Sequence, residues 1–152
     1  MDDVASILEQ YIRHKNCQVR ICAALIFEST LDSFIKTMRI GCEAPSKFNQ
    51  TGSMLGKIVP RTIDSSARVR EISVNILKKI LEIACIYENL TIPDLTMDWM
   101  VDLKNIRDSI TVEDNLTVID SANKIARIIS NRLTNQQYVV FRYEILTFYF
   151  IT

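Results

Sequence analysis

The sequence has few of the residues that form turns, and few that form catalytic or metal sites. Its 152 residues include three glycines, three prolines and one histidine. So little turn chemistry argues against a fold of many short strands and favours long helices. His14 and the cysteines at 17, 22, 42 and 85 show no metal-ligand spacing and no CxxC pair. We therefore expect no metal site and no cofactor, and we expect the cysteines to be small buried hydrophobic residues.

Net charge and long apolar runs are lacking as well. Eighteen basic residues balance 18 acidic ones, so no overall field attracts nucleic acid or an anionic membrane. No uninterrupted apolar run is long enough to span a bilayer. The acidic start, Met1-Asp2-Asp3, is unlike a secretory signal. These absences predict a soluble cytoplasmic protein that has no transmembrane segment and does not bind nucleic acid.

A motif that recurs at nearly constant spacing is the most informative feature that the sequence does contain. It runs Asn16-Cys17-Gln18-Val19-Arg20, then Asp64-Ser65-Ser66-Ala67-Arg68-Val69-Arg70, then Asp114-Asn115-Leu116-Thr117-Val118. Its valines lie 50 and 49 residues apart, a period typical of stacked helical units. The polar residue before each valine is of the type that caps a helix N-terminus (Asn16, Ser65 or Ser66, Asp114 or Asn115).

Equivalent helical faces follow the three motifs, as a true repeat requires. Four, seven and eight residues after each valine come small or apolar residues, which define one buried stripe: Ala23, Ile26 and Phe27; Ser73, Ile76 and Leu77; Ala122, Ile125 and Ala126. We therefore predict an all-α fold, a right-handed α-solenoid of about three helical hairpins plus a C-terminal helix. The hairpins cover about residues 3–40, 48–88 and 97–133, and the last helix covers 135–152, all within one domain.

Hydrophobic periodicity predicts seven helices, over about residues 4–13, 18–38, 50–62, 67–87, 97–109, 115–133 and 135 to the end. Residues 40–49 and 88–96 break the periodicity and are expected to be connectors. Pro60 lies near the end of the third helix, where it would bend or stop the last turn.

The expected last helix is unusually rich in aromatic and β-branched residues. Between residues 138 and 151 it carries Tyr138, Val139, Val140, Phe141, Tyr143, Ile145, Leu146, Phe148, Tyr149, Phe150 and Ile151. It is expected to be the first helix of a fourth hairpin, with apolar surface that a continuing solenoid or a partner would cover. The chain would then be part of a longer solenoid, or self-associate through this helix. A membrane-surface anchor is disfavoured because Arg142 is the helix's only basic residue.

Three segments together resemble a known family. The first is residues 54–61, Met-Leu-Gly-Lys-Ile-Val-Pro-Arg, followed by the Asp64-Ser65-Ser66-x-x-Val69-Arg70 motif. The second is Thr37-Met38 together with residues 43–47. The third is Ile128-Ile129-x-x-Arg132-Leu133. They resemble the core of the maestro HEAT-like repeat proteins over about residues 16–137. The resemblance implies a long helical solenoid that has no catalytic residues. The third repeat departs from the pattern because it has Ile119 where the first two have an arginine.

The Val-Arg pairs are expected to form a structural ladder between the repeats. Valine would enter the core, while arginine would reach across to a carboxylate or carbonyl of the next unit. The predicted ladder residues are Val19, Arg20, Asp64, Val69, Arg70 and Val118. The alternative is that these arginines contact a partner.

Catalytic motifs are incomplete. The 52–57 segment, Gly-Ser-Met-Leu-Gly-Lys, has the outline of a phosphate-binding loop. It is one residue short, however, and lacks the Ser or Thr that binds magnesium. Its glycines are expected to permit close helix packing instead. No acid or oxyanion loop accompanies His14 and Cys17. We predict no enzyme.

A non-enzymatic scaffold that binds a protein or peptide is the predicted function. The alternative is a structural spacer, or a self-association segment of a larger solenoid, without a ligand of its own. In the scaffold interpretation the first helix of each hairpin forms the convex layer, and the second helices line a concave binding face. The predicted contact residues on that face are Glu71, Asn75, Lys78, Lys79, Glu82, Asn123, Lys124 and Arg127.

Overall fold

The structure, a computed structural model, describes residues 10–37, 50–87, 98–111 and 113–151. Within these ranges the regular structure is entirely helical, so the all-α class is confirmed there. Residues 10–12 are helical and belong to the first expected helix, whose remaining residues lie outside the described ranges. The expected connectors, residues 40–49 and 88–96, also lie outside them.

Besides residues 10–12, the described ranges contain six α-helices and one 3-10 helix. Their bounds are α2 Cys17–Thr37, α3 Thr51–Ile58, η1 Val59–Ile63, α4 Ala67–Tyr87, α6 Asp98–Ser109, α7 Asn115–Ser130 and α8 Asn135–Ile151. Helix α4 begins and ends where the periodicity predicts, and most of the other bounds differ from the prediction by one residue. The largest difference is at α7, which ends at Ser130 because Thr134 and Gln137 already cap α8, each bonding the other's backbone N–H.

Pro60 divides the third expected helix in two. The α-helical pattern ends at Ile58, and residues 59–63 continue as the 3-10 helix η1 with Pro60 in its first turn. Proline has no N–H to donate, so the chain can tighten here without losing a helical hydrogen bond. The backbone then becomes extended at Asp64 and turns into α4.

The polar residue at each repeated motif caps the following helix. The Asn16 side chain accepts a hydrogen bond from the N–H of Gln18, and Asp64 accepts one from the N–H of Ser66. Asp114 accepts from the N–H groups of Leu116 and Thr117. In the second motif the cap is therefore provided by Asp64 rather than by the two serines that follow it.

The Asp114 cap predicts a pH dependence of stability. Hydrogen bonds from the Thr117 side chain and backbone lower the pKa of the Asp114 carboxyl from its ordinary value of 3.8. A lowered pKa means that the carboxylate stabilises the fold above its unfolded pKa, and that this stabilisation is lost as pH falls below about 4. Asp114→Asn keeps a capping oxygen but not the charge. Between pH 5 and 3, we expect the midpoint temperature of thermal unfolding to change less in this variant than in the wild-type protein. Glu113→Gln, next to the cap, should show the same pH dependence as wild type.

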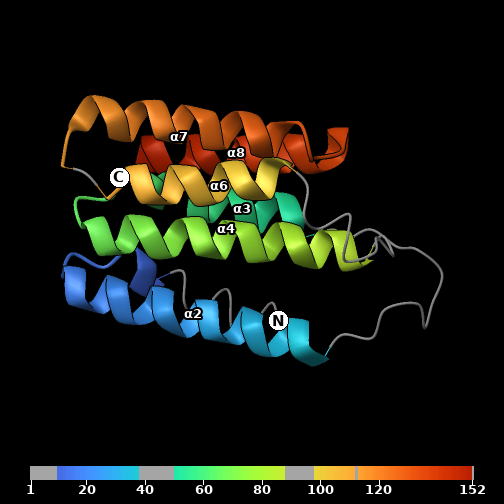
Figure 1. The fold of residues 1–152 in the computed structure, drawn as a ribbon, viewed down its shortest axis with the longest axis horizontal. Coiled ribbons are helices and arrows are strands. Elements are labelled where there is room, and N and C mark those ends of the chain that lie inside the picture. The colour runs from blue at the N-terminus through green and yellow to red at the C-terminus, as the bar shows by residue number, and fades with distance from the viewer. Residues whose placement is uncertain (1–9, 38–49, 88–97, 112, 152) are drawn as a thin grey trace.

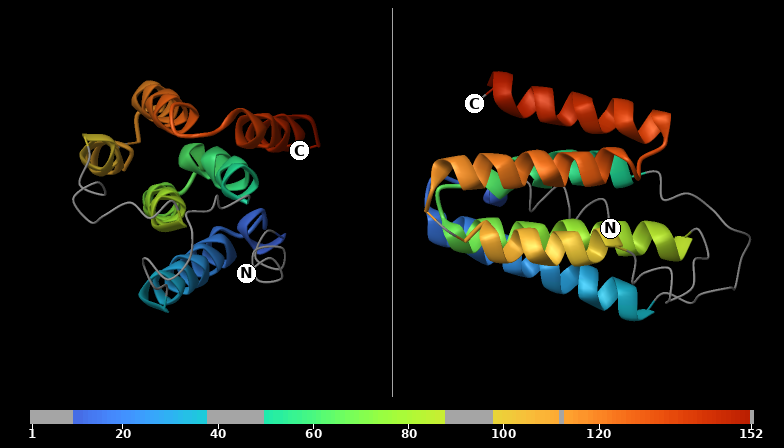
Figure 2. Two further views of the ribbon diagram at one scale, coloured as in Figure 1. Left: turned by 90° about the vertical axis from the view of Figure 1, so that its right-hand side faces the viewer. Right: turned by 45° about the horizontal axis from the view of Figure 1, so that its top comes forward.

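Helices of the three motifs lie roughly parallel in successive tiers (Figure 1). Helix α2 packs on α4, which also contacts α3, η1 and α6. The end-on view shows α6, α7 and α8 side by side above α4 and α3 (Figure 2). Within this upper tier α6 packs on α4, α7 on η1, and α8 on α3.

The predicted division into convex first helices and concave second helices is wrong for the third unit. A regular stack would place α6 on α3 and α7 on α4, but the main contacts of α6 are with α4 and α7. The apolar stripe of α6, formed by Trp99, Leu103 and Ile106 and continued by Ile110 just after the helix, is buried against this part of the core. One face of the molecule is therefore made by α2, α4 and α6, while α7 lies to the side of α6 (Figures 1 and 2).

Helix α4 lies at the centre of the core. It buries 12 of its residues, including Ile72, Ile76, Leu77, Ile80 and Ile83, each at most 1% exposed. Of the predicted buried stripe, Ile76 and Ile125 are buried, but Ile26 on α2 is 55% exposed. The repeat pattern therefore overestimates burial in this outer helix. The expectation for the cysteines is also wrong in part, since Cys17 and Cys22 are exposed and Cys85 is buried, while Cys42 lies outside the described residues.

Candidate protein-interaction surfaces

Arg20 connects the first and second motifs. Its guanidinium donates to the backbone carbonyls of His14 and Lys15, which precede α2, at 2.9 and 3.0 Å. It also donates to the Asp64 carboxylate at 2.8 Å, across 44 residues of sequence. The Asp64 side chain is 3% exposed, and Arg61 approaches its second oxygen at 3.5 Å. One buried carboxylate thus joins the start of α2 to the start of α4.

Arg70 repeats this geometry one unit later. It donates to the carbonyls of Asp64 and Ser65, six and five residues before it, just as Arg20 does to the turn before α2. Its Nε then donates to the carbonyl oxygen of Ile110, at the end of α6, at 2.8 Å. The arginines therefore each bind their own turn and reach the next unit through a separate donor.

The third motif ends the series. The position equivalent to Arg20 and Arg70 is Ile119, which is 54% exposed on α7. The valines of the motifs lie inward, since Val69 and Val118 are buried and Val19 is half-buried. The upper tier therefore presents an apolar side chain where the lower tiers use a polar connection.

Five of the predicted contact residues follow one stripe of α4, between α2 and α6. All five are half-buried: Glu71, Asn75, Lys78, Lys79 and Glu82. Lys79 is engaged within the fold, because its Nζ lies 2.5 Å from the Asp32 carboxylate of α2 and 4.0 Å from that of Glu28. Glu71 pairs with Arg68 on its own helix at 2.6 Å. Two of these five side chains thus hold the fold's own surface together.

The other three predicted contact residues lie elsewhere. Asn123, Lys124 and Arg127 are exposed on α7, and together with Asp120, Ala126, Ser130 and Asn131 they line an open pocket of about 590 Å³. Lys124 pairs with Asp120 one turn earlier at 2.6 Å. Because α7 lies beside α6 rather than beside α4, the structure does not bring this group onto the α4 stripe.

Helix α8 is fixed to α3 through two glycines. A Cβ atom on Gly52 would lie 2.2 Å from the carbonyl oxygen of Gln137, and one on Gly56 would lie 2.6 Å from Glu144 Cβ. The four-residue spacing puts both glycines on one face of α3, so the two helices approach backbone to backbone. Ser53, between them, donates to the Glu144 carboxylate at 2.8 Å. Only the inner face of α8 is covered, where Phe141 is 4% exposed.

The opposite face of α8 is exposed and mostly apolar, with Arg142 its one basic side chain. Its most accessible large apolar side chains are Val139 and Tyr143, which are 67% and 68% exposed. Tyr138, Val140 and Leu146 are each more than 40% exposed, as are Leu116 and Ile119 on α7. We call the exposed side chains of α8, namely Tyr138, Val139, Val140, Tyr143 and Leu146, the α8 outer face. An exposed cluster of this kind is unusual for a surface that meets only water.

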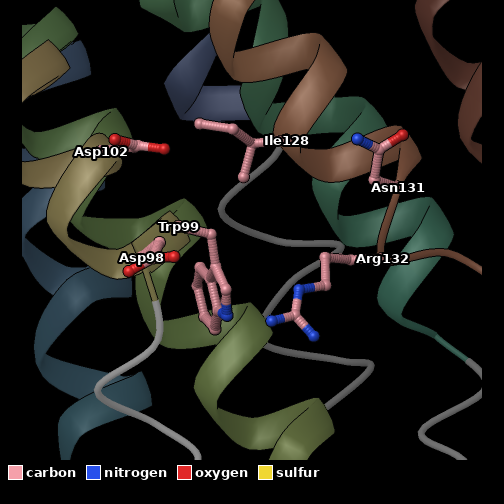
Figure 3. Close-up of a pocket in the computed structure, with 6 residues that line it drawn as sticks. All are labelled: Asp98, Trp99, Asp102, Ile128, Asn131 and Arg132. Atoms are coloured by element: carbon pink, nitrogen blue, oxygen red, sulfur yellow. The ribbon is translucent and has the colours of Figure 1, made fainter.

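A second pocket, of about 500 Å³, opens where α6 begins and α7 ends (Figure 3). It is lined by Asp98, Trp99, Asp102, Ile128, Asn131 and Arg132. The Arg132 guanidinium lies over the Trp99 ring, 4.8 Å from its centroid, in a cation–π arrangement. Trp99 lies on α6 and Arg132 follows the end of α7, and tertiary packing brings them together.

The family model described as Maestro, HEAT repeats matches residues 20–147. The chain belongs to this family. Comparison with curated proteins and with solved structures gave no match. The matched range of the Maestro HEAT repeats includes the arginine connections, the glycine contact and most of α8.

Two absences within the described residues accompany this Maestro HEAT architecture. No group of three or more His, Cys, Asp or Glu side chains could hold a metal ion in the part of the chain that the structure describes. Across the same ranges, none of the helices has the length and apolar content needed to cross a membrane. His14, offered above as an incomplete catalytic residue, has its Nδ1 accepting from the N–H of Asn16 in the turn before α2.

Proposed function

We propose that this chain is a non-enzymatic scaffold that binds another protein through the α8 outer face. The observation that carries the proposal is an apolar helix surface held in place by a close contact on its other side. Membership of a HEAT repeat family supports it, because such stacks typically act as protein-interaction scaffolds. The partner best suited to this face is an amphipathic helix that buries its own apolar stripe there.

The α4 stripe and the α7 group are weaker candidates for the partner surface. Lys79 and Glu71 on the stripe and Lys124 on α7 already pair with neighbouring carboxylates or guanidinium groups. Replacing these ion pairs by ion pairs with a partner protein would add little to the binding free energy, since exposed ion pairs contribute at most about 1 kcal/mol. Burial of apolar surface is the dominant favourable contribution in most protein–protein association, so the α8 outer face is the stronger candidate.

Self-association is the second candidate function. It is favoured by apolar exposure at the opposite end of the stack, where Leu25 and Ile26 on α2 are 40% and 55% exposed. If α2 of one unit covered α8 of another, copies of the chain would join head to tail. The chain would then act as a spacer or self-association segment instead of a receptor for a different protein.

Charge introduced on the α8 outer face tests the proposal. Val139→Lys with Tyr143→Lys places two cations at strongly exposed positions, so folding should be little affected while apolar docking is lost. Lys78→Glu with Glu82→Lys is the matched control on the α4 stripe. We expect proteins that co-purify with the wild-type chain, identified by mass spectrometry, to be retained by the control and lost from the α8 variant.

Two results would argue against this assignment. Loss of the same proteins only from the α4 variant would move the binding surface to the originally predicted stripe. If light scattering shows that wild type alone forms oligomers that the α8 variant does not, self-association replaces binding of a different protein.

A further inference from the structure

One positive charge lies among the apolar side chains of the α8 outer face. Arg142 is exposed. The residues three and four positions before and after it, which are its neighbours on the helix surface, are Tyr138, Val139, Ile145 and Leu146. All four are apolar or aromatic, so none of them can pair with the guanidinium. A partner that covers the apolar side chains of this face must therefore cover Arg142 as well.

The Arg142 guanidinium is available to a group from outside the chain. Among the residues that the structure describes, none forms an ion pair or a side-chain hydrogen bond with it. Glu144 is the only other charged residue of α8. It comes two positions later, so it lies on the opposite side of the helix, where it accepts a hydrogen bond from Ser53 of α3 at 2.8 Å.

A carboxylate is the partner group that fits Arg142. Moving a charge out of water is unfavourable unless the charge is paired and hydrogen-bonded. The two oxygens of a carboxylate match the planar guanidinium, and the charge-assisted bonds that result are stronger than bonds to a neutral acceptor. A lysine or arginine at the same place would instead bring two like charges into an apolar contact. The charge opposite Arg142 should therefore distinguish one partner helix from another.

We infer that the α8 outer face selects an amphipathic helix with a Glu or Asp within or beside its apolar stripe, and that this acid pairs with Arg142. The inference rests on the proposed function and names the chemistry of its partner. In a second copy of this chain, the acids beside the exposed apolar residues of α2 are Glu28 and Asp32, and both already lie next to Lys79. A carboxylate from a different protein is therefore favoured.

A displayed library of amphipathic helices is the probe. Each member has a fixed stripe of leucines, and the positions within and beside the stripe are fully randomised. Members that bind the immobilised wild-type chain are sequenced and synthesised, and their affinities are measured by fluorescence anisotropy. Peptides that bind wild type but not the Val139→Lys, Tyr143→Lys double variant are assigned to the α8 outer face. We expect these peptides to be enriched in Glu or Asp at one randomised position.

Charge reversal assigns the contact to Arg142. Arg142→Glu should weaken such a peptide about tenfold or more, because repulsion replaces a charge-assisted pair. Changing the enriched acid of the peptide to Lys should restore binding to Arg142→Glu and weaken binding to wild type, which also shows that the variant is folded. The matched control is Lys104→Glu at an exposed position of α6. It changes the net charge equally and should bind the original peptide as wild type does.

Two results would overturn the inference and leave the proposed function in place. One is a set of peptides that depend on the α8 outer face but carry no enriched acid, with aromatic or uncharged residues instead. The other is an acidic preference that Arg142→Glu does not reverse. A different result would overturn the proposed function and the inference together, namely that no selected peptide loses binding in the Val139→Lys, Tyr143→Lys variant.

Discussion

Asp64→Ala is expected to lower the free energy of unfolding by about 3–5 kcal/mol, the range for removing one partner of a buried ion pair. The Asp64 side chain is 3% exposed and lies 2.8 Å from Arg20 and 3.5 Å from Arg61. Its removal leaves the Arg20 guanidinium, 10% exposed, without its carboxylate. It also removes the cap on the Ser66 N–H at the start of α4. Because α4 contacts four other elements, loss of this anchor should weaken the whole stack.

Chemical denaturation followed by circular dichroism measures this change. The matched control is Asp108→Ala, which removes a carboxylate 3.0 Å from Arg107 that is 62% exposed. Exposed pairs of this kind contribute about 0–1 kcal/mol, so the control should unfold nearly as wild type does. A loss below about 1 kcal/mol for Asp64→Ala would show that the Arg20 connection does not stabilise the stack, contrary to our account.

Gly52→Ala is expected to destabilise the protein by about 1–3 kcal/mol, the usual cost of overpacking a well-packed contact. Within a helix, this change ordinarily stabilises by up to about 1 kcal/mol because alanine loses less backbone entropy on folding. Here the new Cβ would lie 2.2 Å from the backbone oxygen of Gln137, which cannot rotate away as a side chain can. Helix α8 must therefore move off α3, and the contact at Gly56 should weaken with it.

The sign of the change is the decisive observation. Ser29→Ala, at an exposed position of α2, is the control for helix propensity, and it should be neutral or slightly stabilising. Gly56→Ala should also destabilise, since its Cβ would lie 2.9 Å from the carbonyl oxygen of Phe141. A stabilising Gly52→Ala would mean that α8 does not lie as close to α3 as the structure places it.

Periodicity predicted the helices well because each buries a stripe whose spacing is local in sequence. The bounds of α4 and the effect of Pro60 on α3 follow from residues within one or two turns. Neighbour relations are different, because they depend on which apolar face meets which. Both α3 and α4 are buried on several sides, so equivalent stripes on α6 and α7 could have packed in either order. The sequence therefore could not predict that α6 lies on α4.

The candidate surfaces, too, could be predicted from the sequence only where the signal is local. The motif spacing directed attention to Arg20 and Arg70, whose partners at Asp64 and Ile110 lie 44 and 40 residues away. The apolar content of α8 was evident, but every side of that helix is rich in apolar residues. Only the contact with Gly52 and Gly56 determines which side is covered and which is the outer face. The pairing of Trp99 with Arg132 joins two helices and leaves no signal in local sequence.

Site-specific photo-crosslinking tests the proposed binding surface most directly. A benzoylphenylalanine at position 143, on the α8 outer face, is compared with one at position 78, on the α4 stripe, in cells that produce the protein. Our account predicts covalent adducts with another protein from position 143 and few from position 78. Adducts from position 78 with none from position 143 would contradict it, and would place the partner on the face formed by α2, α4 and α6.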